Sequence, residues 1–214
     1  MRKFWKMFQT AFLFCIVMMI LCSFIYPLAL TGVSQITMKY QANGSLIDQN
    51  GNFTTDIDKA VGSELLGQNF TESYYFHGRV SSVHYNTYTR EQKEQGEYGG
   101  ASSGSFNYGS SNPELRERME ADIQAFLKSH PGVKKEEIPA DLLTASGSGL
   151  DPHISPEAAK IQIDTVAANS GLSREQVAGI VEKNTEHKVF GIFGEERVNV
   201  LKCNLDVAEA MGNL

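Results

Sequence analysis

The longest apolar run in the chain lies near its N-terminus, from Ala11 to Leu30, and contains no charged residue. Its length matches the ~20 residues that a helix needs to cross a hydrocarbon core ~30 Å thick. A cleaved signal peptide is the alternative, but its apolar part is usually ~7–15 residues long, and Pro27-Leu28-Ala29 makes a poor cleavage site. The pattern therefore predicts an uncleaved membrane helix over residues 11–30.

After this run the chain changes to short segments separated by glycine, asparagine and serine. Two turn dipeptides flank Leu46-Ile47 within residues 42–55, which predicts a hairpin or a loop. Aromatic residues gather within residues 62–79 and predict a strand that enters the core. Residues 96–111 are rich in Gly and Ser and predict an extended loop. The aromatic residues of the predicted strand are Phe70, Tyr74, Tyr75 and Phe76.

Three helices are predicted where a capping residue precedes apolar positions at helical spacing. The first ends near His130, and the second follows a loop over residues 142–155 and ends at Gly171. Gln176 completes a capping box at the start of the third. The three N-terminal caps are Asn112, Ser155 and Ser173.

The C-terminal part adds one strand, because residues 197–201 alternate between polar and apolar, and a short helix over residues 206–211. The elements together predict an α+β fold: one N-terminal transmembrane helix followed by a single mixed α/β extracytoplasmic domain. We expect residues 1–10 in the cytoplasm, residues 11–30 in the membrane and residues 31–214 outside.

The charges that flank the apolar run set this orientation. Arg2, Lys3 and Lys6 precede the run, whereas Lys39 is the only basic residue in the comparable window after it. Positive charge is retained on the cytoplasmic side, so the N-terminus is expected inside the cell and the rest of the chain outside the plasma membrane.

Composition narrows the classes of partner for the external part. All 25 Asp and Glu and 16 of the 19 Lys and Arg lie beyond residue 30, so that part carries a formal charge of −9. Such a surface repels nucleic acid, and we expect no nucleic-acid partner. Cys15 and Cys22 lie in the membrane run and leave Cys203 alone outside, so no disulfide can stabilise the external domain.

Motifs for catalysis are largely missing from the sequence. It has no phosphate-binding Gly-x-x-x-x-Gly-Lys-Ser/Thr loop, no His-Glu-x-x-His, no Gly-x-Ser-x-Gly and no paired zinc-binding cysteines. Asp151 and His153 lie within reach of each other but make an incomplete metal site. Asp151-Pro152 is typical of a turn, and Ser155-Pro156 of a helix start, so we interpret His153 as a polar residue in that corner. No catalytic residue and no metal site are predicted.

Several segments together resemble one family, the C subunit of the Kdp potassium-transporting P-type ATPase of bacteria and archaea. The most specific stretch is DLLTASGSGLDPHISP at residues 141–156, and GEERVNVL at residues 194–201 closes the chain in the family's manner. The chain departs from the family at residues 104–109, GSFNYG, where a Gly-Gly-Ser-Asn-like run is usual. Further matches are Tyr26-Pro27-Leu28, Thr31-Gly32, Gly62-Ser63, Leu66-Gly67-Gln68, Phe70, Tyr75-Phe76, Arg79, Ser81 and Ser111-Asn112-Pro113.

The resemblance implies a non-catalytic, membrane-anchored accessory subunit that is needed to assemble and run an ATP-driven, high-affinity potassium uptake pump. Its partners would be the potassium-translocating A subunit, the ATP-hydrolysing B subunit and a small F subunit, together with the lipid bilayer. The chain lacks the Asp-Lys-Thr-Gly phosphorylation motif of P-type pumps, which agrees with a non-catalytic role.

The family is described as raising the ATP affinity of the catalytic subunit, and the resemblance implies Gln162 as a nucleotide contact. The expected topology argues against direct contact, because an external domain is separated by the membrane from cytoplasmic ATP. ATP would then act through the catalytic subunit. The alternative hypothesis is an anchored extracellular hydrolase or ligand-binding domain that uses Asp151, His153 and nearby serines.

Overall fold

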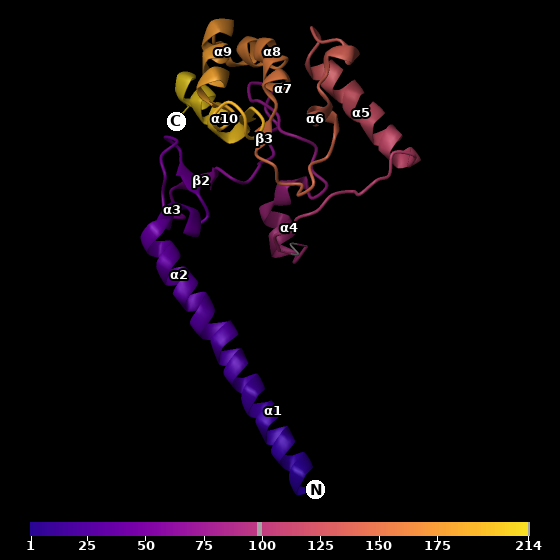
Figure 1. Ribbon diagram of the computed structural model, residues 1–214. Helices are drawn as coiled ribbons and strands as arrows, with labels where there is room; N and C mark the ends of the chain where they lie inside the picture. The colour runs from indigo at the N-terminus through magenta and orange to yellow at the C-terminus, as the bar shows by residue number, and fades with distance from the viewer. Residues whose placement is uncertain (98–99, 214) are drawn as a thin grey trace. The chain divides into compact units, whose positions relative to one another are not determined.

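The computed structural model describes residues 1–97 and 100–213 (Figure 1). The chain divides into two compact units, Met1–Ser45 and Leu46–Leu214. We call the second the α+β unit, because it contains helices and two small antiparallel sheets. The fold class expected from the sequence is thereby confirmed.

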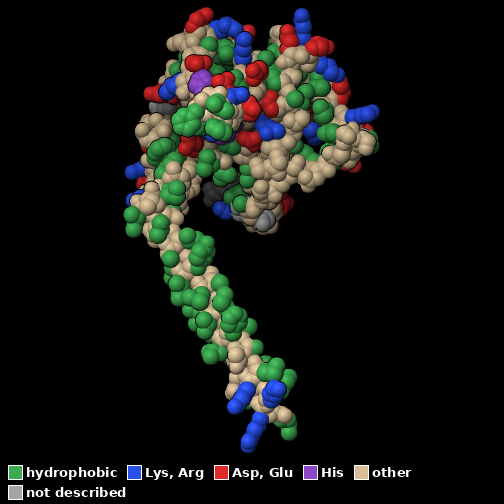
Figure 2. All heavy atoms as spheres, viewed as in Figure 1, with side chains coloured by type: hydrophobic (Ala, Val, Ile, Leu, Met, Phe, Trp, Pro, Cys, Tyr) green, Lys and Arg blue, Asp and Glu red, His purple; other side chains and the backbone are tan. Residues whose placement is uncertain are grey.

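The first unit is dominated by one continuous helical run, Arg2–Thr37, which is long and apolar enough to cross a membrane. It consists of α1 (Arg2–Ile20), a π-helical turn η1 (Leu21–Ile25) and α2 (Tyr26–Thr37), and a short helix α3 (Lys39–Ala42) follows. Figure 2 shows apolar side chains along this helix and basic side chains at its N-terminal end. At 1.5 Å per residue the run is roughly 54 Å long, so it extends several turns beyond a hydrocarbon core.

The π-helical turn lies directly before Pro27, and this position has a physical cause. Proline lacks an N–H group, and its ring clashes with the carbonyl four residues earlier in a regular helix. In η1 the N–H of Tyr26 bonds the carbonyl of Leu21, five residues back. The wider turn gives the ring space, so the helix continues past Pro27 instead of ending there.

The α+β unit contains two sheets and nine helical segments among the residues described. Strands β1 (Leu46–Asp48) and β2 (Ala60–Ser63) form one antiparallel pair, and β5 lies between β3 and β4 in the second sheet. The remaining bounds are η2 (His84–Asn86), α4 (Arg90–Glu94), α5 (Pro113–Ser129), η3 (Lys135–Glu137), α6 (Ala140–Leu143), β3 (His153–Ile154), α7 (Pro156–Lys160), α8 (Ile163–Ser170), α9 (Arg174–Lys183), β4 (Thr185–Glu186), β5 (Arg197–Asn199) and α10 (Val200–Ala210).

The predicted helix starts are confirmed, because each depends on a local hydrogen bond. The side chain of Asn112 accepts from an N–H in the first turn of α5, and Ser155 does the same at α7. Ser173 and Gln176 form the expected capping box of α9. Gly171 ends α8 with a φ of +76°, a left-handed conformation that favours glycine.

Of the hairpin or loop predicted over residues 42–55, the structure shows a hairpin. Ile47 and Phe53 form an antiparallel bridge across the turn that contains Gly51, whose φ is +74°. The predicted loop at residues 96–111 has no regular structure from residue 100 to residue 109, whereas Tyr98 and Gly99 lie outside the described residues. The loop at residues 142–155 contains the short strand β3.

Three element predictions are wrong in whole or in part. The aromatic segment after β2 is not a strand, although Phe76 is buried. The helix expected from Ser155 to Gly171 is divided into α7 and α8, because the chain turns at Gln162. The last strand ends at Asn199, whose side chain accepts from the N–H of Lys202, so α10 begins at Val200 instead of at residue 206.

The hydrophobic core of the α+β unit lies among helices α5 to α10 and strand β5. Figure 1 shows α7 to α10 gathered on one side of this unit and α5 on the other. Side chains from α5, α6 and the aromatic segment complete the core. Its most deeply buried members are Phe76, Ile154, Ala158, Ala159, Val166, Val177, Val198, Cys203 and Val207.

Candidate functional site

The loop of residues 142–155 connects three segments that are distant in the sequence. Its backbone bonds the chain near β2, the chain before η2 and the chain after residue 100, so one loop fixes all three. The N–H of Gly67 donates to the carbonyl of Leu150 at 2.8 Å. The N–H of Ser146 donates to the carbonyl of Val80 at 3.2 Å, and the N–H of Gly104 donates to the carbonyl of Ser148 at 2.8 Å.

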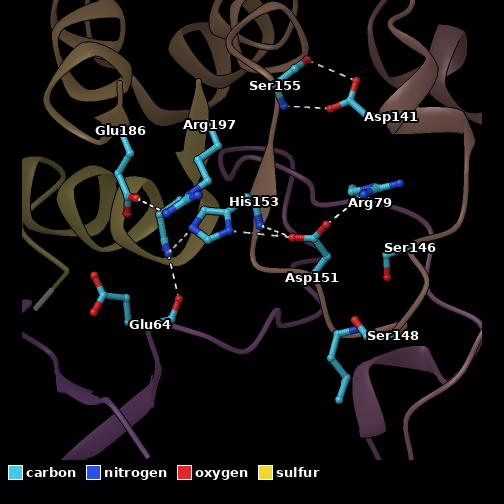
Figure 3. A network of polar contacts seen from close by, with 12 residues as sticks. Glu64, Arg79, Asp141, Ser146, Ser148, Asp151, His153, Ser155, Glu186 and Arg197 are labelled. Carbon is cyan, nitrogen blue, oxygen red and sulfur yellow. Dashed lines mark hydrogen bonds and ion pairs between the residues drawn. The ribbon is translucent and has the colours of Figure 1, made fainter. Parts of the chain in front are cut away.

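Asp151 lies at the centre of the polar network shown in Figure 3. Its Oδ2 accepts from the guanidinium of Arg79 at 2.8 Å, and its Oδ1 accepts from the backbone N–H of His153 at 3.0 Å. Both side chains of the Arg79–Asp151 pair are about three-quarters buried. The bond from the N–H of His153 to the side chain of Asp151 closes the turn that the Asp-Pro-His sequence predicts.

The imidazole of His153 faces Asp151 on one side and Asn199 on the other. Its Nδ1 is 3.8 Å from Asp151 Oδ1, beyond hydrogen-bond distance, and its Nε2 is 3.5 Å from Asn199 Nδ2. Burial, together with the nearby guanidinium of Arg197, lowers the pKa of His153. This environment therefore favours the neutral form of the ring.

The serines near His153 are engaged elsewhere. Ser146 Oγ accepts from the N–H of Gly149 at 2.8 Å, and Ser148 Oγ accepts from the next N–H at 3.1 Å. Ser155 Oγ donates to Asp141 at 3.1 Å and caps α7. Nucleophilic catalysis needs a serine within hydrogen-bond distance of its base, and these bonds hold the three hydroxyls in turns and caps instead.

Metal binding is not supported either. Within residues 1–97 and 100–213, no group of three or more His, Cys, Asp or Glu side chains is placed to hold a metal ion. Asp151 instead pairs with Arg79 and bonds the backbone of His153, so its contacts join segments of the chain to one another.

Two glycines make this loop arrangement possible. Gly149 has a φ of +68°, and a Cβ there would lie 2.7 Å from a methyl carbon of Val83 and 2.9 Å from the carbonyl oxygen of Gly104. A Cβ on Gly67 would lie 2.5 Å from the carbonyl oxygen of Asp151. The Gly-rich composition indicated a loop, but it gave no signal of this close packing.

A second feature without a sequence signal is the turn η2 next to the network. His84, Tyr85 and Asn86 have consecutive φ values of 48°, 53° and 54°, a conformation that non-glycine residues adopt only under constraint. The hydroxyl of Tyr85 donates to the carbonyl of Arg79, and burial raises the pKa of this phenol to about 12. Asn86 bonds the backbone of Ser102. These bonds hold the turn in its strained conformation.

Gln162 is fully buried between α7 and α8, with an exposed fraction of 0%. Its Oε1 accepts from the N–H of His77 at 2.8 Å, and its Nε2 donates to the carbonyls of His77 at 3.2 Å and Ala158 at 3.1 Å. The amide thus satisfies the backbone of the aromatic segment. The nucleotide contact stays a prediction, and this conformation leaves no exposed atom of Gln162 to make it.

Burial of three histidines predicts a pH-dependent stability. Burial lowers the pKa of His77, His130 and His153, whereas in the unfolded chain the imidazole pKa is about 6.5. Below about pH 6.5 the unfolded state therefore binds more protons than the folded state. We expect the unfolding temperature of the full chain in detergent to fall as the pH is lowered from 7.5 to 5.

His187 offers the matched control, because it is exposed and its pKa is raised by the hydrogen bond that its ring donates to the carboxylate of Glu196. The His187→Gln variant should still lose unfolding temperature as the pH is lowered from 7.5 to 5. The His130→Gln variant should lose less over the same range. An unfolding temperature that stays constant over this pH range would contradict the prediction.

A helix long enough to span a membrane, joined to one small α+β unit, fits the class of single-span membrane proteins. The family model described as "K+-transporting ATPase, c chain" (KdpC) matches residues 8–209, so the chain belongs to this family, as the sequence predicted. A relative from Clostridioides difficile (strain 630), "Potassium-transporting ATPase KdpC subunit", is 54% identical over 97% of this chain and 99% of its own length. A relative with the same name from Clostridium kluyveri is 52% identical over 99% of this chain and 98% of its own length. Another from Caldanaerobacter subterraneus is 47% identical over 92% of this chain and 91% of its own length.

Proposed function

We propose that the chain is a non-catalytic, membrane-anchored accessory subunit of an ATP-driven potassium uptake pump, needed for assembly and activity of the complex. The observation that carries this proposal is the family match over residues 8–209, together with relatives of the same length that are named as subunits of a potassium-transporting ATPase. Its partners would be the potassium-translocating A subunit, the ATP-hydrolysing B subunit and the small F subunit.

The geometry of the polar network supports an accessory role over an anchored hydrolase. Asp151 is paired with Arg79, and the serines beside His153 bond the backbone or Asp141. A domain that uses its polar groups to fix loops offers a rigid surface to partners. We therefore place the function of this chain in assembly.

The flanking charges support a topology with residues 1–10 in the cytoplasm, a span at residues 11–30 and residues 31–214 outside the plasma membrane. In that topology the α+β unit and ATP lie on opposite sides of the bilayer. An increase in the ATP affinity of the catalytic subunit would then be an allosteric effect transmitted through the partner subunits. A direct contact from Gln162 would additionally require α7 and α8 to separate.

Co-purification tests the proposed function. An affinity-tagged version of the chain, isolated in gentle detergent from cells grown at low potassium, should carry the A, B and F subunits and show potassium-stimulated ATP hydrolysis. Deletion of the gene for this chain should leave the other subunits unassembled or inactive. A chain that purified alone, and whose deletion left potassium uptake intact, would overturn the proposal.

The topology predicts that an exposed thiol in the α+β unit reacts from outside the cell. Ser103 is exposed, and Ser103→Cys should be labelled in intact cells by a cysteine reagent that cannot cross membranes. The background is low, because Cys15 and Cys22 lie in the predicted span and Cys203 is fully buried with its pKa raised by burial. Labelling only after cell rupture would reverse the orientation.

A further inference from the structure

The segment between β4 and β5 presents a group of exposed apolar side chains. We call Val189, Phe190, Ile192 and Phe193 the apolar tip; their exposed fractions are 60%, 89%, 74% and 66%. The backbone of Val189 bonds that of Phe193 in both directions, at 2.8 and 3.0 Å, and Gly191 at φ +72° turns the chain between them. Soluble proteins rarely leave so many large apolar groups together in water without a binding role.

The base of this hairpin is fixed to the core. Strand β5 pairs with β4 and contributes Val198, which is 1% exposed. Two ion pairs and one hydrogen bond between side chains cross the hairpin. They join His187 to Glu196 at 2.9 Å, Lys188 to Glu195 at 3.3 Å and Arg197 to Glu186 at 2.5 Å.

The size of the apolar tip limits what can cover it. Given ~150–250 Å² for each aromatic side chain, its four members expose roughly 500 Å². A stable interface between two free proteins needs about 800 Å² per partner, so the tip alone is too small to hold a second copy of this chain. The tip can add to the affinity of a contact made by the membrane helix. Because the two are linked in one chain, binding of the helix makes binding of the tip intramolecular, so even a small second contact raises the overall affinity.

The net charge of the chain distinguishes a protein from the lipid surface as the partner of the tip. Glu195 and Glu196 are paired within the hairpin with Lys188 and His187, but the part of the chain beyond residue 30 carries −9 as a whole. An anionic lipid surface would repel a unit with this excess of negative charge, whereas an apolar pocket on a protein would not.

We propose that the apolar tip inserts into an apolar pocket on a membrane-embedded subunit of the pump, and that it forms a second attachment point of this chain in addition to its membrane helix. The proposal rests on the proposed function, because it takes its partner from the same complex.

Photo-crosslinking identifies the occupant directly. With benzoylphenylalanine in place of Phe190, irradiation of the assembled pump in membranes should join this chain to another pump subunit. Attachment to lipid, attachment to a second copy of this chain, or no attachment would overturn the proposal. A variant that still purifies with the pump but gives one of these results refutes the tip contact alone, whereas a wild-type chain that does not purify with the pump refutes the proposed function.

A matched pair of substitutions measures the contribution of the tip. Ile192 and Ile57 are the same residue type, with exposed fractions of 74% and 79%. Phe190→Ser with Ile192→Ser should increase the rate at which the chain dissociates from the purified pump about tenfold, and Ile192→Ser alone should increase it severalfold. Ile57→Ser should leave the rate unchanged. Equal rates for Ile192→Ser and Ile57→Ser would overturn the proposal, and unchanged unfolding temperatures would show that the variants remain folded.

Discussion

Replacing Gln162 with leucine is expected to lower the free energy of unfolding of the α+β unit by about 2–5 kcal/mol, since each buried backbone group left without a partner costs ~1–3 kcal/mol. The substitution removes the partners of both the N–H and the carbonyl of His77 in a site with no exposed surface. Leucine fills a similar volume but offers no polar atom. The aromatic segment would then lose both of the hydrogen bonds that join the backbone of His77 to Gln162.

Denaturant unfolding of the full chain in detergent measures this effect. Trp5 lies in α1, so near-UV circular dichroism of the tyrosines is the better probe of the α+β unit. Gln124→Leu on the exposed face of α5 is the matched control, and such surface changes stay within about 0.5 kcal/mol. A Gln162→Leu variant with unchanged stability but weakened ATP activation of the pump would contradict the structural role and favour the nucleotide contact.

The aromatic segment shows where prediction from sequence fails. Its composition is that of a strand, but at Phe76 and His77 the partners of its backbone are side-chain amides and not another strand. Asn204 bonds both the N–H and the carbonyl of Phe76, at 2.8 and 3.0 Å, from 128 residues away, and Gln162 bonds His77 from 85 residues away. A local pattern cannot reveal such partners, and strand propensity mainly reflects how well a side chain packs in a half-buried position.

Helix starts were predictable for the opposite reason. The bonds made by Asn112 and Ser173 span two and three residues, so the residues that make them are adjacent in the sequence. The break between α7 and α8 was missed because the apolar positions keep helical spacing across it, from Ala159 to Ile163 and Val166. The membrane helix was found from its apolar run, but its full length was not, because the flanking turns are less apolar.

Only part of the candidate site could be predicted from the sequence. Asp151 and His153 were identified because they are two residues apart and their turn is local. Arg79 lies 72 residues from Asp151, and no pattern around it indicates the ion pair. The apolar tip was overlooked because its residues resemble a strand of the core, and only the structure shows that they are exposed.

Replacing Gly149 with alanine should destabilise the α+β unit by about 2–5 kcal/mol, because a left-handed backbone costs a non-glycine residue ~1–2 kcal/mol and overpacking a further ~1–3 kcal/mol. The methyl group of Val83 can move away from the new Cβ, but the carbonyl oxygen of Gly104, at 2.9 Å, is backbone. Relief therefore requires the loop of residues 142–155 to shift. That shift would strain the Arg79–Asp151 pair as well.

Gly147 is the matched control, because it lies two residues away in the same loop, is exposed, and has no atom within 4 Å of its Cβ position. Gly147→Ala should leave the stability unchanged or raise it by up to about 1 kcal/mol, because alanine lowers the conformational entropy of the unfolded chain. Denaturant unfolding of both variants separates close packing from a general need for flexibility in this loop. Equal losses of stability in the two variants would contradict the close-packing argument, whereas a loss confined to Gly149→Ala would show that glycine preserves the close packing of this loop against Val83 and Gly104.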